Sequence, residues 1–284
     1  MPKAMFMIIC CLMLGGAAVW ENAGQAQEMS FIELEGDTDG IWFVAFTPDG
    51  KKVVATDLKS TRMWDTETGK ELQRLPKLGA HIVCISPDGK KIATESSVAN
   101  IKKNVQIWDI ESGKELQKFS GGCPTYAKDH TLFFTPDGGK IVTVDFDENG
   151  AKNTVIIWDV ESGKELQKLE HTTNYVLFAT FSPDGKKVVT GGWDEAVRIW
   201  DTETGKELQK LEGHVDYATI AAFTPDNKKV VTKDRDGTAR VWDVESGKEL
   251  QKLRGRFVAL SPNGKKMVTI GIGNTDMRIW DTDS

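Results

Sequence analysis

Four histidines are the side chains of this sequence best suited to metal binding or acid–base chemistry. They are His81, His130, His171 and His214, and each precedes a segment with the composition of a strand. A metal site would require them to converge, but their spacings differ, so we expect no metal site among them. The sequence contains no nucleophile elbow, no phosphate-binding glycine loop and no paired-histidine zinc motif. We therefore expect no catalytic residue and no cofactor.

One acidic segment, Asp145 to Gly150, matches the opening of a calcium-binding loop. Oxygen-bearing side chains alternate at Asp145, Asp147 and Asn149, and a glycine follows for the turn. The twelfth position of such a loop is Ile156 instead of glutamate, which excludes a helix–loop–helix calcium site. We interpret the segment as an acidic hairpin tip, and a simpler calcium-binding turn stays open as the alternative.

The first 26 residues have the three-part pattern of a secretory signal. Lys3 is followed by 16 uncharged residues, 4–19, and then by small residues before a cleavage site after Ala26. A retained membrane anchor is the alternative, but the apolar run is short for a membrane span. We predict a signal peptide over residues 1–26 and an exported protein, periplasmic or extracellular, with no membrane span after cleavage.

The remaining cysteines and the charge pattern exclude other classes of protein. Outside the signal only Cys84 and Cys123 remain, which is too few for a disulfide framework, and whether they pair stays open. The net charge is −6 at pH 7, and lysines alternate with acidic residues in the same short segments. Nucleic-acid binding needs a clustered excess of Lys and Arg, so we expect no nucleic-acid partner.

An internal repeat runs through nearly all of the remaining chain. The dipeptide Trp-Asp recurs at intervals of 44, 50, 42, 42 and 38 residues, and its tryptophans are Trp64, Trp108, Trp158, Trp200, Trp242 and Trp280. A second motif, Thr/Ser-Pro-Asp/Asn-Gly/Asn, precedes each of these tryptophans. A third motif, Glu-Thr/Ser-Gly-Lys-Glu-Leu-Gln, follows every Trp-Asp except the last. Three motifs in a fixed order indicate six copies of one structural unit.

Each unit is predicted to consist of short strands separated by turns. In the Pro-Asp-Gly motif, proline fixes φ while Asp and Gly tolerate a tight turn. Val, Ile and Thr in the flanking runs favour strands, and adjacent apolar pairs such as Val188-Val189 indicate burial on both faces of a sheet. Residues 205–211 have a helix-forming composition, but the period leaves them the place of a fourth, outer strand, which we predict.

With Trp-Asp at the end of a strand in every unit, the chain from Phe31 to Ser284 resembles the WD40 repeat family. The resemblance implies an all-β fold, a six-bladed β-propeller of four-stranded antiparallel blades around a central channel. One such domain would fill residues 27–284.

The two ends of the repeat region predict how the ring closes. The chain stops just after the sixth Trp-Asp, so the sixth unit lacks an outer strand. Near the other end, Leu34-Glu35-Gly36 matches Leu211-Glu212-Gly213 of the fourth unit. We expect the N-terminal strand, residues 31–35, to pair with residues 278–281 and remove the exposed sheet edge. A monomer is expected, and a dimer or an incomplete ring is the alternative.

The resemblance also implies a hydrogen-bond network of His, Ser/Thr, Asp and Trp inside each blade. In the fifth unit the matching residues are His214, Thr232, Asp236 and Trp242. In the fourth unit Thr190, Asp194 and Trp200 match, but His171 is one residue out of register. The other units match less well, so we expect blades 1, 2, 3 and 6 to depend more on packing.

The segments that differ between units lead into the first strand or connect the second strand to the third. The resemblance places both on one face of the disc, and loops on a rigid scaffold are the usual place for recognition. Aromatic residues outside the repeated motifs lie in these variable segments and could anchor a partner: Trp42, Tyr126, Tyr175, Trp193 and Tyr217. The alternative for Trp42 and Tyr217 is that each begins a buried strand.

The sequence therefore predicts a non-catalytic scaffold of the cell envelope or exterior that binds a protein or peptide. An alternative is a propeller-type hydrolase or metal-dependent enzyme with its site at the channel mouth, where His130, Asp145 and Asp147 would be the first candidates. A purely structural surface protein is a third possibility. The repeat framework does not specify the ligand, because such propellers share a framework and not a function.

Overall fold

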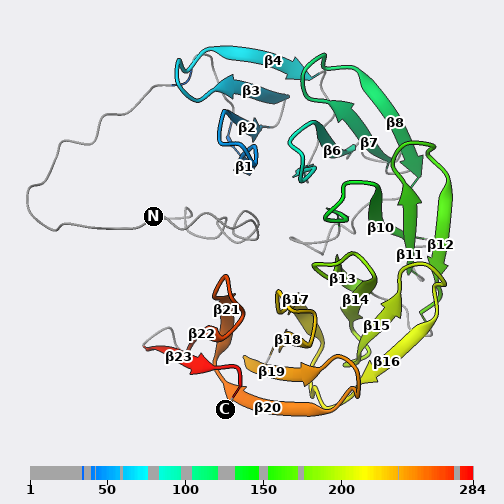
Figure 1. Ribbon diagram of the computed structural model, residues 1–284, viewed down its shortest axis with the longest axis vertical. Coiled ribbons are helices and arrows are strands. Elements are labelled where there is room, and N and C mark those ends of the chain that lie inside the picture. The colour runs from blue at the N-terminus through cyan, green and yellow to red at the C-terminus, as the bar shows by residue number, and fades with distance from the viewer. Residues whose placement is uncertain are drawn as a thin grey trace, which may run out of the picture.

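The computed structural model describes residues 34, 40–41, 43–57, 60–75, 83–96, 104–120, 132–146, 153–171, 176–235, 237–271 and 276–283. Regular structure in these ranges is entirely β, in six antiparallel sheets and without a helix. This confirms the predicted all-β fold class. Figure 1 shows the sheets side by side as the blades of an arc, with the first strand of a blade inside and the last outside.

The blades follow the order of the chain. Blade 1 contains β1 (Phe43–Phe46), β2 (Lys52–Thr56), β3 (Thr61–Asp65) and β4 (Glu71–Leu75). Blade 2 contains β5 (Val83–Ile85), β6 (Lys91–Ser96), β7 (Asn104–Asp109) and β8 (Glu115–Ser120). Blade 3 contains β9 (Phe133–Phe134), β10 (Lys140–Phe146), β11 (Asn153–Asp159) and β12 (Glu165–Leu169).

The second half repeats the pattern. Blade 4 contains β13 (Val176–Phe181), β14 (Lys187–Gly192), β15 (Val197–Asp201) and β16 (Glu207–Leu211). Blade 5 contains β17 (Ala218–Phe223), β18 (Lys229–Asp234), β19 (Thr238–Asp243) and β20 (Glu249–Arg254). Blade 6 contains β21 (Arg256–Leu260), β22 (Lys266–Ile270) and β23 (Met277–Asp281), so its sheet has three strands within the described residues.

The repeated sequence motifs form the turns between strands. In blade 1 the hydroxyl of Thr47 donates to Asp49 at 2.6 Å, and the amide of Gly50 donates to the Thr47 carbonyl at 2.8 Å. The hydroxyl of Thr47 and the amide of Lys51 hold the pKa of the Asp49 carboxyl below its usual value. The residue at the Gly50 position needs a positive φ, and in blade 5 Asn227 supplies it at 61°.

The predicted outer strand is confirmed, against the helix-forming composition of its residues. β16 pairs with β15, and its side chains alternate between Leu208, which is 43% exposed, and Leu211, which is fully buried. The side chain of Gln209 donates to the carbonyl of Glu245 in blade 5 at 2.5 Å. Gln117 makes the same bond from blade 2 to blade 3 at 2.7 Å. The tertiary context therefore overrides local helix propensity here.

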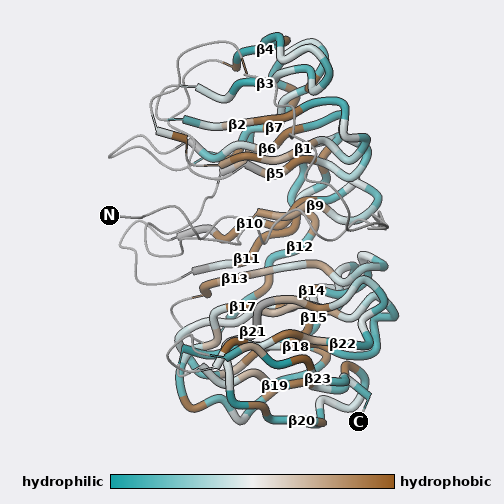
Figure 2. Tube along the Cα trace, turned by 90° about the vertical axis from the view of Figure 1, so that its left-hand side faces the viewer, coloured by the Kyte–Doolittle hydropathy of each residue, from teal (hydrophilic) through white to brown (hydrophobic). Residues whose placement is uncertain are grey.

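Packing between successive blades forms the hydrophobic core. Val188 and Val189 are adjacent on β14 and fully buried, because Val188 packs with residues of blade 3 and Val189 with residues of blade 5. Two of the repeat tryptophans illustrate this packing, since Trp200 lies against blade 3 and Trp242 against blade 4. Figure 2 shows the apolar segments running through the stacked blades. The predicted burial on both sheet faces is confirmed.

Blades 1 and 6 lie at the two ends of the arc (Figure 1). Among the described residues, Val53, Ala55 and Trp64 form an apolar cluster within blade 1 alone. On β23, Ile279 is 74% exposed, whereas Ile199, at the same place in blade 4, is fully buried against blade 5. The two end faces therefore expose positions that are buried at the junctions between blades.

The predicted closure by residues 31–35 is not decided by these observations. Except for Leu34, that segment lies outside the described residues. The closure stays a prediction, and the exposed positions on β23 are the surface that it would cover.

Candidate partner-binding surface

Two of the five aromatic residues predicted to bind a partner lie against each other where blades 4 and 5 meet. The rings of Trp193 and Tyr217 are stacked, with centroids 6.1 Å apart and an angle of 25° between their planes. Trp193 is 55% exposed, and Tyr217, directly before β17, is half-buried. The other three, Trp42, Tyr126 and Tyr175, lie outside the described residues.

Backbone geometry brings the Trp193 turn, between β14 and β15, against blade 5. A Cβ on Gly191 would lie 2.5 Å from Cζ of Phe178 on the neighbouring strand β13 of blade 4, so glycine makes room for this buried ring, and it would lie 3.3 Å from Cβ of Ala218 on β17 of blade 5. Glu195 completes the turn with a φ of 59°. A left-handed conformation costs a non-glycine residue about 1 kcal/mol. The turn that presents Trp193 is therefore specified by packing beneath it.

Arg235 extends the row of rings and was not predicted. Its guanidinium carbon lies 5.3 Å from the centroid of the Tyr217 ring, and its backbone amide donates to the Tyr217 carbonyl at 3.2 Å. The side chain is exposed, and no carboxylate among the described residues pairs with it, unlike the buried Arg198 and Arg240. Its place in the turn between the second and third strands of blade 5 is the signal that could have identified it.

A buried chain of hydrogen bonds fixes blade 5 beneath this surface. Nε1 of Trp242 donates to Oγ1 of Thr232 at 2.7 Å, and Oγ1 lies 2.7 Å from Nε2 of His214. Nδ1 of His214 lies 2.8 Å from Oδ2 of Asp234. Because Thr232 accepts from Trp242, its hydroxyl proton is assigned to Nε2, and His214 then donates from Nδ1 to the carboxylate.

The carboxylate of this network is Asp234, whereas the sequence prediction named Asp236, which lies outside the described residues. Side chains alternate along a strand, so Thr232 and Asp234 share one face of β18. Arg240 is 1% exposed and bonds Asp234 through Nη1 at 3.0 Å and Glu249 through Nε at 2.9 Å. The strand period would have favoured Asp234 over the turn position that the family pattern suggested.

Blade 4 holds the corresponding histidine without such bonds. His171 is 3% exposed, its ring centroid lies 5.0 Å from that of Trp200, and neither ring nitrogen has a hydrogen-bond partner among the described residues. Trp200 donates to Thr190 at 2.7 Å, as the prediction for this blade required. At the position of Asp234 blade 4 has Gly192, so the carboxylate that orients the blade 5 histidine is missing.

The surroundings of His171 disfavour its charged form. Burial, reinforced by the nearby positive charge of Arg198, lowers the pKa of His171 to about 4, and the charge of Asp194 only partly opposes this. Arg198 and Asp194 form an ion pair with each other. The out-of-register histidine is therefore a neutral, buried imidazole near neutral pH.

The bond between Trp and Thr also occurs in blades for which the sequence predicted reliance on packing. The indole nitrogen donates to a threonine at 2.9 Å in blades 2 and 3 and at 2.8 Å in blade 6, in the pairs Trp108–Thr94, Trp158–Thr143 and Trp280–Thr269. In blade 1 the equivalent position is Ala55. The prediction was therefore too narrow, since this part of the network recurs in five blades.

The residues predicted for other chemistry are largely beyond the described ranges. His81, His130, Asp147, Asn149 and Cys123 lie outside them, and only the backbone of Asp145 is described, on β10. Cys84 lies on β5 and is half-buried. Within the described ranges, no three His, Cys, Asp or Glu side chains gather in a way that could hold a metal ion.

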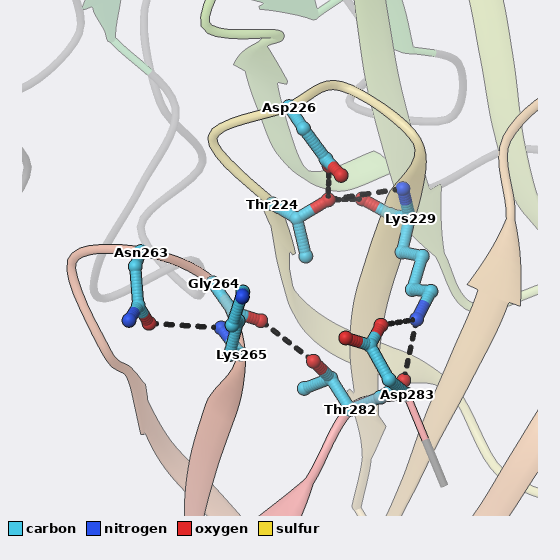
Figure 3. Close-up of a pocket in the computed structure, with 8 residues that line it drawn as sticks. All are labelled: Thr224, Asp226, Lys229, Asn263, Gly264, Lys265, Thr282 and Asp283. Atoms are coloured by element: carbon cyan, nitrogen blue, oxygen red, sulfur yellow. Dashed lines mark hydrogen bonds and ion pairs between the residues drawn. The ribbon is translucent and has the colours of Figure 1, made fainter.

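A polar pocket of about 70 Å³ lies between the turns of blades 5 and 6 (Figure 3). Two lysines, Lys229 and Lys265, line it, and Nζ of Lys229 donates to the carbonyl of Thr282 at 2.6 Å and to the carboxylate of Asp283 at 2.5 Å. These bonds join the end of blade 6 to blade 5. The pocket therefore serves to join the two blades.

The repeated blades and their internal Trp–Thr bonds define an all-β protein of the propeller class. WD40 repeats, described as "WD domain, G-beta repeat", are detected at residues 29–65, 163–201 and 205–243. No curated protein matches the chain significantly. Its fold is similar to the crystal structure of the computationally designed Ika8 protein, with 25% identity and a TM-score of 0.69 over 87% of this chain and 73% of that one. A search of the described residues for a helix able to cross a membrane finds none.

Proposed function

We propose that this chain is a non-catalytic scaffold of the cell envelope or exterior that binds a protein or peptide. The observation that carries the proposal is the exposed Trp193 stacked on Tyr217, on turns that differ between blades. Aromatic residues of this kind are enriched among the few that supply most of the energy of an interface. WD40 repeats in three segments support an interaction role.

The rigidity of blades 4 and 5 supports recognition at this place. The turns that carry Trp193, Tyr217 and Arg235 are anchored by close packing at Gly191 and by the buried His214 network. A preorganised surface loses less conformational entropy on binding than a mobile one. The signal-like segment over residues 1–26 supports the envelope or the exterior as the place of action.

Affinity capture from envelope and external fractions, with quantitative mass spectrometry, tests the proposal. The wild-type chain is compared with a Trp193→Ala, Tyr217→Ala double variant, and Leu208→Ala on the outer strand of blade 4 serves as a control of similar exposure. We expect the control to retain its partner and the double variant to lose it while keeping the wild-type melting temperature. A folded double variant that captures the same partner to the same extent would contradict the proposal.

A further inference from the structure

The charged groups around the aromatic stack are not equivalent. Asp216, next to Tyr217, accepts the backbone amide of Tyr217 at 2.8 Å, and Asp194, next to Trp193, pairs with Arg198. Asp194 is therefore paired with a cation, whereas Asp216 is held by a neutral amide.

Among the described residues of these turns, two exposed charged side chains remain. Glu195 follows Trp193 in its turn, and the guanidinium of Arg235 lies over the Tyr217 ring. No carboxylate among the described residues neutralises Arg235.

The position of Arg235 prepares it for a carboxylate. A guanidinium stacked on an aromatic ring keeps its N–H groups free at the edge, where a carboxylate can accept two of them. The backbone bond to Tyr217 and the stacking restrict the side chain before a ligand arrives. A lysine at this position would provide charge without the planar fork.

We propose that this surface binds an extended acidic segment of a partner protein, an inference that rests on the proposed function. An Asp or Glu of the segment pairs with Arg235, and a proline, aromatic or aliphatic side chain packs on Trp193. The separations of 5.3 Å and 6.1 Å from the Tyr217 ring keep the Arg235 guanidinium and the Trp193 ring within about four residues of extended chain. Glu195, two residues after Trp193 in the same turn, disfavours an acidic residue beside Trp193.

Selection from a random dodecapeptide display library on the purified chain provides the first test. We expect selected peptides to contain Asp or Glu within four residues of a proline, aromatic or aliphatic residue, and to be poor in Lys and Arg. Selected peptides that depend on Trp193 but show no acidic enrichment would overturn this inference and leave the proposed function standing. Peptides that bind the Trp193→Ala, Tyr217→Ala variant equally well, or no selected peptides at all, would count against both.

Fluorescence anisotropy with one selected peptide and its Asp/Glu→Asn/Gln counterpart gives the second test. Arg235→Gln should weaken the acidic peptide about tenfold and leave the neutral counterpart unchanged. Arg235→Lys should recover only part of the loss, Trp193→Ala should weaken both peptides, and Glu195→Gln should strengthen the acidic one. Leu208→Ala is the control. Equal effects of Arg235→Gln on both peptides would overturn the assigned carboxylate contact.

Discussion

The buried imidazole of His171 makes the stability of the protein depend on pH in a defined window. Its pKa is 6.5 in the unfolded chain and about 4 in the folded protein. Between these values the unfolded chain binds more protons, so stability is present above pH 6.5 and falls as the pH drops toward 4. The two pKa values give a loss of about 2 kcal/mol between pH 7 and pH 5.

The substitution His171→Phe isolates this effect, because phenylalanine keeps a ring against Trp200 and has no group that titrates. Between pH 7 and pH 5 the wild type should lose about 2 kcal/mol more unfolding free energy than the His171→Phe variant. Near pH 7 the variant should be at least as stable as the wild type, because two buried nitrogens without partners are removed.

Urea denaturation followed by tryptophan fluorescence at half-unit steps between pH 7 and pH 5 measures the difference. The turn carboxylates, such as Asp49 and Asp65, have pKa values lowered by their hydroxyl and amide donors, so they titrate below this window. If wild type and His171→Phe lose stability in parallel across it, the reasoning from burial is wrong.

Three further predictions follow from the same structure. Asp234→Ala should lower the unfolding free energy by about 3 kcal/mol, because the buried Arg240 guanidinium and His214 imidazole lose their carboxylate. Asp236→Ala should change the unfolding free energy by less than about 1 kcal/mol. Equal losses for the two variants in urea titrations would contradict the assignment of Asp234 as the carboxylate of the network. Gly191→Ala should cost about 2 kcal/mol by overpacking against the buried ring of Phe178, and an unchanged melting curve would refute this close contact. N-terminal sequencing of the protein from the envelope or medium should begin at Gln27; a mature chain that retains residues 1–26 would point to an anchor.

Sequence reasoning succeeded where periodicity and burial act together. The recurrence of the Glu-Leu-Gln motif identified β16 and the fourth strands of the other blades as outer strands, although their composition favours helices. The adjacent valines Val188 and Val189 indicated a sheet buried on both faces, and each belongs to a different blade junction. The Glu-Leu-Gln motif recurs in five of the six units, so the reading of any one copy is supported by the others.

Sequence reasoning reached less far where a single position departs from the repeat. The family pattern named Asp236, which lies outside the described residues and stays a prediction, whereas the carboxylate seen bonded to His214 is Asp234, which alternation along β18 puts on the face of Thr232. Arg235 was missed because only its contact with Tyr217, across the start of another strand, distinguishes it from other exposed arginines. Such contacts depend on how closely neighbouring blades pack against each other, which the spacing of the sequence motifs does not specify.

We propose that the ring of sheets is closed by the first strand of the mature chain. If Leu34-Glu35-Gly36 takes the place that Leu211-Glu212-Gly213 has in blade 4, Leu34 lies opposite Met277, as Leu211 lies opposite Val197. Met277 is 76% exposed, so its side chain is a position that this strand would cover.

Disulfide crosslinking measures this contact directly, in a chain whose Cys84 and Cys123 are replaced by serine. The pair Leu34→Cys, Met277→Cys is compared with Val197→Cys, Leu211→Cys, whose residues are opposite in β15 and β16. Crosslinking requires Cα atoms within about 7 Å. We predict that both pairs crosslink within one chain to a similar extent. A control pair that crosslinks while the Leu34–Met277 pair stays reduced, or joins two chains, would contradict it.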